Sequence, residues 1–245
     1  MGDMNVHVLD AGKIVETVAR LRDRIAERFP ESGLAAVAAD LSQTARETAS
    51  RVELLNRPNL ALRALAAGAV ILGLAAQVYV AHLVDWDAVI RRSDAVGISQ
   101  GLDAIVNLLL LAFAAIWFVL TLEQRLKRRR ILRQLFELRS FAHVVDMHQL
   151  TKDPTVLLSG GAATPSSPSR KMSEFELSRY LDYCAEMLAL IAKLAALYAG
   201  KTPDGAVLAA VNEVEALTSD LGRKIWQKIM IINRLDERMP PSQSS

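Results

Sequence analysis

The chain has 245 residues, a formal net charge of +2 and 51% hydrophobic residues. So small a net charge creates no overall field that would attract nucleic acid, so basic residues matter by their position. Aromatic residues make up only 5% of the chain, beside 12 Gly and 8 Pro, which favours helices over a β fold. Cys184 is the only cysteine. It excludes an internal disulfide and fits a reducing compartment.

Two amphipathic helices are predicted in the N-terminal segment, residues 1–57. The first is capped by Asp10 and runs to about Phe29, with apolar residues four, three and four apart. Pro30 and Gly33 separate it from a second helix at 31–56. The pair predicts an N-terminal helical hairpin. The residues expected on its inner faces are Ile14, Val18, Leu21, Ile25, Leu34, Val37, Leu41, Thr44, Thr48, Val52 and Leu55.

Two long apolar runs follow at 60–84 and 102–122, with a loop at 85–101 between them. Each run has about 20 residues, enough for a helix to cross a hydrocarbon core of about 30 Å. In lipid the backbone must satisfy its own hydrogen bonds, which favours helices. The sequence therefore predicts an all-α membrane protein. Its domains are a two-helix transmembrane hairpin at 58–122 and a cytoplasmic antiparallel helical bundle built from the segments on either side.

Basic residues cluster after the second run, and they predict an orientation. The loop at 85–101 has only Arg91 and Arg92 against three Asp residues. The positive-inside rule then places both termini in the cytoplasm and the protein in the plasma (inner) membrane as a multi-pass protein. The basic run is also expected to contact anionic lipid headgroups rather than nucleic acid, because it lacks interleaved aromatic residues. The run consists of Arg125, Lys127, Arg128, Arg129, Arg130 and Arg133.

Gln77 and Asn107 are polar residues within the two apolar runs. An antiparallel pairing of the runs puts both amides at a similar depth. A hydrogen bond between their side chains, or across an oligomer, would reduce the cost of burying them in lipid. The alternative interpretation is that they line a polar pore.

The segment 123–150 continues the second run as a cytoplasmic helix, and its end is rich in side chains that could act chemically. His143 and Asp146 are three residues apart and share a helix face, whereas His148 lies about 140° around the helix from His143. These three residues are candidates for a metal or catalytic site. No HExxH or Cys/His spacing supports a metal, and no cofactor is assigned. A structural role for these polar groups at the helix end is favoured.

A linker is predicted at 151–172, a helical hairpin at 173–236 and a disordered tail at 237–245. Ser173 and Glu176 have the spacing of a capping box. Apolar residues then recur every three and four positions in two seams, which Gly200 and Thr202-Pro203 separate, with Pro203 at the first position of the second helix. The seams consist of Leu177, Leu181, Cys184, Leu188, Ile191, Ala195 and Tyr198, and of Val207, Val211, Val214, Thr218, Leu221, Ile225, Ile229 and Ile232.

Three classes of function are compatible with these patterns. The favoured one is a membrane-anchored interaction or scaffolding protein whose helical bundle associates with itself or with a helical protein partner. The first alternative is an oligomeric ion pore or a membrane-perturbing effector. The second is a membrane-tethered, metal-dependent enzyme or sensor that uses His143, Asp146 and His148. The sequence has no phosphate loop, nucleophile elbow or triad-like spacing, so catalysis is not the favoured interpretation.

Overall fold

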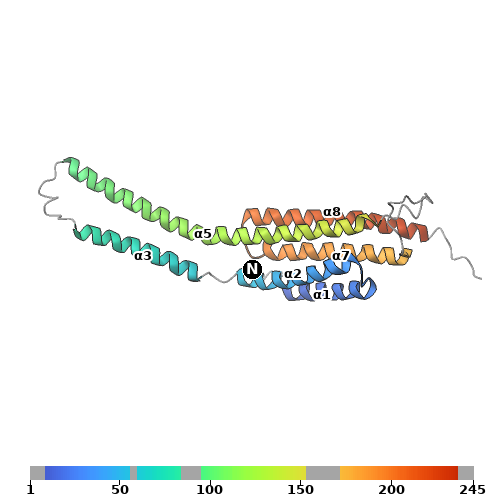
Figure 1. Cartoon of the computed structure of the whole chain (residues 1–245). Helices are drawn as coiled ribbons and strands as arrows, with labels where there is room; N and C mark the ends of the chain where they lie inside the picture. Colours follow the sequence, from blue (N-terminus) through green and yellow to red (C-terminus); the bar gives the residue numbers. More distant parts are fainter. Residues whose placement is uncertain (1–8, 56–59, 84–94, 153–171, 237–245) are drawn as a thin grey trace, which may run out of the picture. The chain divides into compact units, whose positions relative to one another are not determined.

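The computed structural model describes residues 9–55, 60–83, 95–152 and 172–236 (Figure 1). The chain divides into two compact units, the bundle (Met1–Asn56 and Arg130–Ser245) and the apolar unit (Arg57–Arg129). The helices of the described residues are α1 (Ala11–Arg28), α2 (Gly33–Leu55), α3 (Leu60–Leu83), α5 (Ala95–Leu150), α7 (Glu174–Ala199) and α8 (Gly205–Asp236).

Helices α1 and α2 form the predicted N-terminal pair. The Asp10 carboxylate accepts hydrogen bonds from the backbone N–H groups of Gly12 and Lys13, at 2.8 and 3.2 Å, and so caps α1. Helix α2 begins at Gly33, two residues later than predicted. The predicted inner faces are confirmed except at Leu55, whose side chain lies outside the described part. The buried residues are Ile14, Val18, Leu21, Ile25, Leu34, Val37, Leu41, Thr44, Thr48 and Val52.

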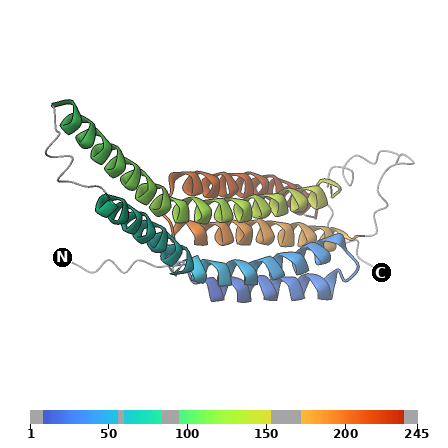
Figure 2. The ribbon, with the colours of Figure 1, turned by 60° about the vertical axis from the view of Figure 1, so that its left-hand side comes forward.

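Helix α7 lies at the centre of the bundle. In both views it lies between α2 on one side and α5 and α8 on the other, with α1 beside α2 (Figures 1 and 2). The predicted capping box is present, because the Ser173 hydroxyl accepts from Glu176 N while the Glu176 carboxylate accepts from Ser173 N. Its buried residues surround most of its circumference, since α7 packs against α1, α2 and α8. They include every member of its predicted seam.

Helix α8 begins at Gly205, not at Pro203 as predicted. The Asp204 carboxylate accepts from the backbone N–H groups of Ala206 and Val207, at 3.0 and 3.2 Å, and so satisfies the first turn. Pro203 therefore precedes the cap. The predicted seam of α8 is confirmed, since all eight of its members are buried.

Helix α5 belongs to the bundle from Arg130 onward. It runs antiparallel to α2, because Arg51 bonds to Gln134 while Gly33 lies against His148. It runs parallel to α8, because Arg139 bonds to Glu213 and, further along both helices, Gln149 bonds to Lys228.

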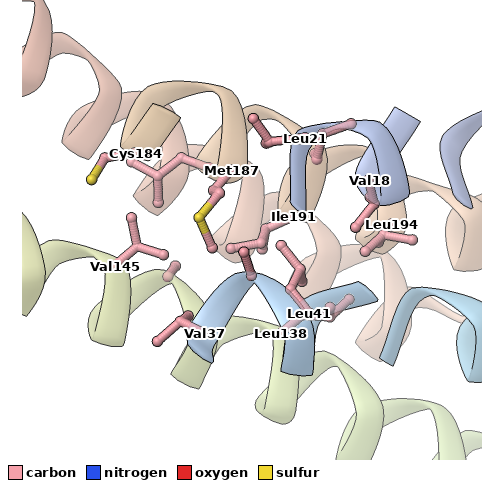
Figure 3. Close-up of a cluster of buried hydrophobic side chains, with 14 of the residues drawn as sticks. Val18, Leu21, Val37, Leu41, Leu138, Val145, Cys184, Met187, Ile191 and Leu194 are labelled. Carbon is pink, nitrogen blue, oxygen red and sulfur yellow. The ribbon is translucent and has the colours of Figure 1, made fainter. Parts of the chain in front are cut away.

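Side chains from α1, α2, α5 and α7 meet in one hydrophobic core (Figure 3). Met187 and Ile191 of α7 are fully buried, and Leu41 of α2 and Leu138 of α5 are at most 1% exposed. Burial of a side chain of this size stabilises the fold by roughly 1.5–3 kcal/mol relative to its exposure. The bundle therefore has a hydrophobic core of its own.

The predicted transmembrane hairpin is contradicted. The two apolar runs do form helices, α3 and part of α5. Among the described residues, however, no helix combines the length and the apolar character that crossing a membrane requires. The all-α helical bundle is confirmed, whereas the predictions of a membrane protein and of a multi-pass plasma-membrane location are contradicted. The orientation of the termini and the pore alternative lose their basis with the spans.

The bounds of the predicted segments differ from those of the helices. The predicted loop was 85–101. Residues 84–94 lie outside the described part, and α5 already begins at Ala95. Most of the predicted linker and the whole predicted tail, 153–171 and 237–245, also lie outside it.

Candidate functional site at the end of helix α5

The last turns of α5 carry a chain of hydrogen bonds that reaches α8. Gln149 is almost fully buried. Its Nε2 donates to Asp146 Oδ1 at 2.5 Å, and its Oε1 accepts from Lys228 Nζ at 2.6 Å. Lys228 Nζ also donates to the backbone oxygen of Gln149 at 3.0 Å. The ammonium group thus lies at the C-terminal end of α5, where a positive charge complements the helix dipole.

The imidazole of His148 packs directly against the start of α2. A Cβ atom added at Gly33 would lie 2.4 Å from His148 Cε1, closer than side-chain atoms can approach. Only a residue without a side chain leaves room for the ring at its present position. His148 therefore joins α5 to α2, and the side chain of Asp146 is hydrogen-bonded to Gln149.

An aromatic cluster lies beside this network. Lys152 Nζ lies 5.2 Å from the centroid of the Tyr180 ring, within the range of a cation–π contact. The Phe29 ring meets Tyr180 edge to face, with centroids 5.4 Å apart. Burial raises the pKa of the Tyr180 phenol, so its hydroxyl stays protonated at neutral pH. These contacts hold α1, α5 and α7 together at this end of the bundle.

Cys184 is fully buried on α7 near the same end (Figure 3). Burial raises the pKa of its thiol to about 12, although the charges of Lys228 and Lys152 lower it. A thiol with so high a pKa holds almost no thiolate at neutral pH, and the thiolate is the nucleophilic form. Cys184 is therefore a packed core residue.

The structure does not assemble the three candidate metal ligands into a site. His143 is exposed on the outside of α5, whereas His148 packs on Gly33. No group of three or more His, Cys, Asp or Glu side chains that could hold a metal ion occurs among the described residues. The hydrogen bonds among Asp146, Gln149 and Lys228 connect the end of α5 to α8.

The other predicted site residues lie in the helices of the apolar unit or just beyond it. In the basic run Lys127 is half-buried, and the arginines, Arg125, Arg128, Arg129, Arg130 and Arg133, are exposed. Contact of this run with anionic headgroups stays a prediction. Asn107 is exposed on α5, while Gln77 belongs to α3 and its side chain lies outside the described part. Their pairing therefore stays a prediction as well.

A shallow hollow of about 370 Å³ lies on the bundle surface between α1 and α7, lined by Arg24, Glu27, Arg28 and Tyr183. Arg24 already binds both carboxylate oxygens of Glu186, at 2.6 and 2.7 Å. The guanidinium group of Arg24 also lies over the Tyr183 ring. The hollow thus lies beside a satisfied surface pair and offers little unpaired charge to a ligand.

Sequence reasoning did not identify Gln149 and Gly33 as members of this region. In the sequence Gly33 indicates only a break between helices. Gln149 and Lys228 are 79 residues apart, so no local spacing connects them. The one available signal was the presence of a Lys and a Gln within otherwise apolar patterns.

Fold and site together define an all-α helical bundle in which a buried hydrogen-bond network links α5 to α8 at one end. Comparisons with protein-family models, curated proteins and solved structures found no match for this chain.

Proposed function

We propose that this chain is a helical interaction protein that assembles through its apolar unit. In this proposal the bundle is the stable module, and the helices of the apolar unit bind apolar helices of another copy. Scaffolding of this kind needs a folded module and an apolar interaction surface, and it requires no catalytic group.

The observation that carries the proposal is the exposure of large apolar side chains in the apolar unit. On α5 the rings of Phe113 and Trp117 stack at 6.3 Å and are 65% and 62% exposed. Exposed apolar surface of this extent marks interaction sites, because leaving it in water is unfavourable. The exposed side chains are Ile71, Leu72, Val78 and Tyr79 on α3, and Val106, Leu109, Leu110, Leu111, Phe113, Ile116, Trp117 and Phe118 on α5.

The contrast with the bundle supports the same proposal. The bundle buries its own predicted seams, so its helices need no partner to cover their core faces. The apolar residues at positions 106, 110, 113 and 117 of α5 are spaced four, three and four apart, which places them on one stripe. A helix of a second copy could cover such a stripe by the knobs-into-holes packing of paired helices.

The test is the mass of the full chain in solution, measured by size-exclusion chromatography with light scattering. We expect an oligomer for the natural chain. The double variant Leu110→Glu with Phe113→Glu should have a lower mass, because charges on the stripe would have to be desolvated in the interface. The matched control is Phe175→Glu, which changes an exposed aromatic residue of the bundle and should leave the mass unchanged.

Two outcomes would contradict assembly through the apolar unit. One is a natural chain that stays monomeric at tens of micromolar, since an interface of standard size holds at much lower concentrations. The other is an oligomer whose mass is the same in the double variant.

A further inference from the structure

Helix α5 of the bundle has a second apolar face, which points away from the core. Its inner face buries Leu135, Leu138, Ala142 and Val145. On the opposite side Phe136, Met147 and Leu150 are 71%, 67% and 60% exposed, and Ser140 and His143 between them are exposed too. The residues at positions 136, 140, 143, 147 and 150 follow a 4-3-4-3 spacing. We call these five residues the outer seam.

The spacing of the outer seam is that of a paired helix. Residues three and four apart in alternation form the a and d positions of a heptad, which insert into a facing helix. The five helices of the bundle already satisfy their core without this face. The outer seam is therefore a ready-made contact for one more helix.

We infer that the outer seam binds the outer seam of a second copy in the antiparallel direction. A symmetric pair of identical faces requires that residue i meets residue j and that j meets i. With the two-fold axis between Phe141 and Ala142, Phe136 meets Met147 of the second copy, and Ser140 meets His143. Each contact occurs twice. A Met thioether packs favourably against an aromatic ring, and a Ser hydroxyl can donate to a neutral imidazole.

Charges beside the outer seam fit the same register. Arg139 and Asp146 are one heptad apart and flank the seam on the same edge. In the antiparallel pair each Arg139 lies beside Asp146 of the second copy, which gives two opposite-charge contacts. Within its own chain Arg139 is 3.2 Å from Glu213, with its side chain still 44% exposed, and Asp146 accepts from Gln149 through Oδ1. In a parallel pair Arg139 would instead face position 144 of the second copy, a Val, so this opposite-charge contact would not form.

The surface of the outer seam sets the strength of this dimer. In this register Leu150 lies opposite Arg133 of the second copy, so Phe136 and Met147 are the large apolar side chains that pair, and they cover less than the roughly 800 Å² per partner of a standard interface. The dimer is therefore weak, and it forms at high local concentration. It involves none of the residues proposed for assembly of the apolar unit, so the two contacts are independent.

Disulfide trapping in the full chain tests the register. A mixture of the single variants Phe136→Cys and Met147→Cys, mildly oxidised, should give a disulfide-linked dimer at several times the yield of either variant alone. In the antiparallel register two copies of position 136 lie about 16 Å apart along the helix, from 11 residues at 1.5 Å each. They are too far apart to bond. Cys184 is buried and contributes no background.

The matched control mixes Phe136→Cys with Ser219→Cys, an exposed position on α8 that is not part of the outer seam. A yield from Phe136→Cys with Met147→Cys no higher than this control would overturn the dimer. Efficient bonding of Phe136→Cys to itself would mean a parallel pair and would overturn the register. The trapped dimer should persist when Leu110→Glu and Phe113→Glu are added, so failure of this contact and failure of the assembly proposed for the apolar unit are distinguishable.

Discussion

At the scale of single residues, the contact of the His148 ring with Gly33 ties the end of α5 to the start of α2. Neither residue is special by type, since a histidine on a helix and a glycine near a helix start are both common. They matter because a Cβ atom at position 33 would lie only 2.4 Å from His148 Cε1. The same holds for Cys184, whose burial rather than its sulfur chemistry determines what it does.

Gly33→Ala should lower the free energy of unfolding by about 1–3 kcal/mol, because the new methyl group would force the imidazole to move. In the background of His148→Ala the ring is gone. The same substitution should then be neutral or stabilising by up to about 1 kcal/mol, since Ala has the better helix propensity. Urea denaturation of the four proteins measures this cycle. An equal cost of Gly33→Ala in both backgrounds would show that the ring is not the obstacle.

The thiol of Cys184 should be unreactive in the folded chain. With a pKa of about 12, its thiolate fraction at pH 8 is lower on the order of 10³-fold than that of a free thiol. We expect no reaction with a chromogenic disulfide until guanidinium unfolds the protein. Because folding raises this pKa, its contribution to stability is present below the unfolded value of about 8.5 and is lost as pH rises through 12. Rapid labelling of the native chain would contradict the burial.

At the scale of elements, helix ends in this protein are set by specific caps. Asp10, Ser173 and Asp204 each accept backbone N–H groups of the helix that follows. These are the donors that a helix leaves unsatisfied at its start. Local sequence was sufficient to predict the first two caps. The third was missed because Pro203 offered a competing start signal one residue earlier.

Ser173→Ala should lower the free energy of unfolding by about 1 kcal/mol, the usual cost of losing an N-cap. Ser219→Ala, at an exposed position within α8, is the control and should cost nothing because Ala favours helix. Circular dichroism during urea unfolding measures both. A null result for Ser173→Ala would mean that tertiary packing alone holds the start of α7.

The capping box also carries a pH dependence. The Glu176 carboxylate accepts a hydrogen bond from the Ser173 backbone N–H, and this bond lowers the pKa of Glu176. The stability that this carboxylate contributes is therefore present above the ordinary glutamate pKa and is lost as pH falls through the lowered value. The difference in stability between the natural chain and Glu176→Gln, which removes the charge of this side chain, should accordingly shrink in acid.

At the scale of the whole molecule, the bundle and the apolar unit differ in the exposure of their apolar side chains. The bundle hides its apolar faces, and periodicity predicted those faces residue by residue. The apolar unit exposes its apolar side chains, and here sequence reasoning led to the transmembrane hairpin that the described helices contradict. A run of apolar residues reports composition along a line. It does not specify what surrounds the apolar side chains of the helix that the run forms.

The candidate site was predictable only in part. The sequence indicated that the end of α5 was chemically dense, but its partners come from α2, α7 and α8. Lys228 and Gly33 reach the site through long-range packing, for which a single sequence has no periodic signal. The same limit applies to the candidate ligands His143, Asp146 and His148, because the contacts of His148 with Gly33 and of Asp146 with Gln149 depend on how the side chains pack.

The sequence by itself determined the helices of the bundle, the inner faces of α1, α2, α7 and α8 and two of the caps, because these depend on the residues within one or two turns. The tertiary structure alone decided that α7 lies at the centre, that α5 runs parallel to α8, and that the outer seam of α5 is left uncovered. Those outcomes depend on how whole faces fit together in space. Contacts between distant residues are formed only when the complete set of helices packs.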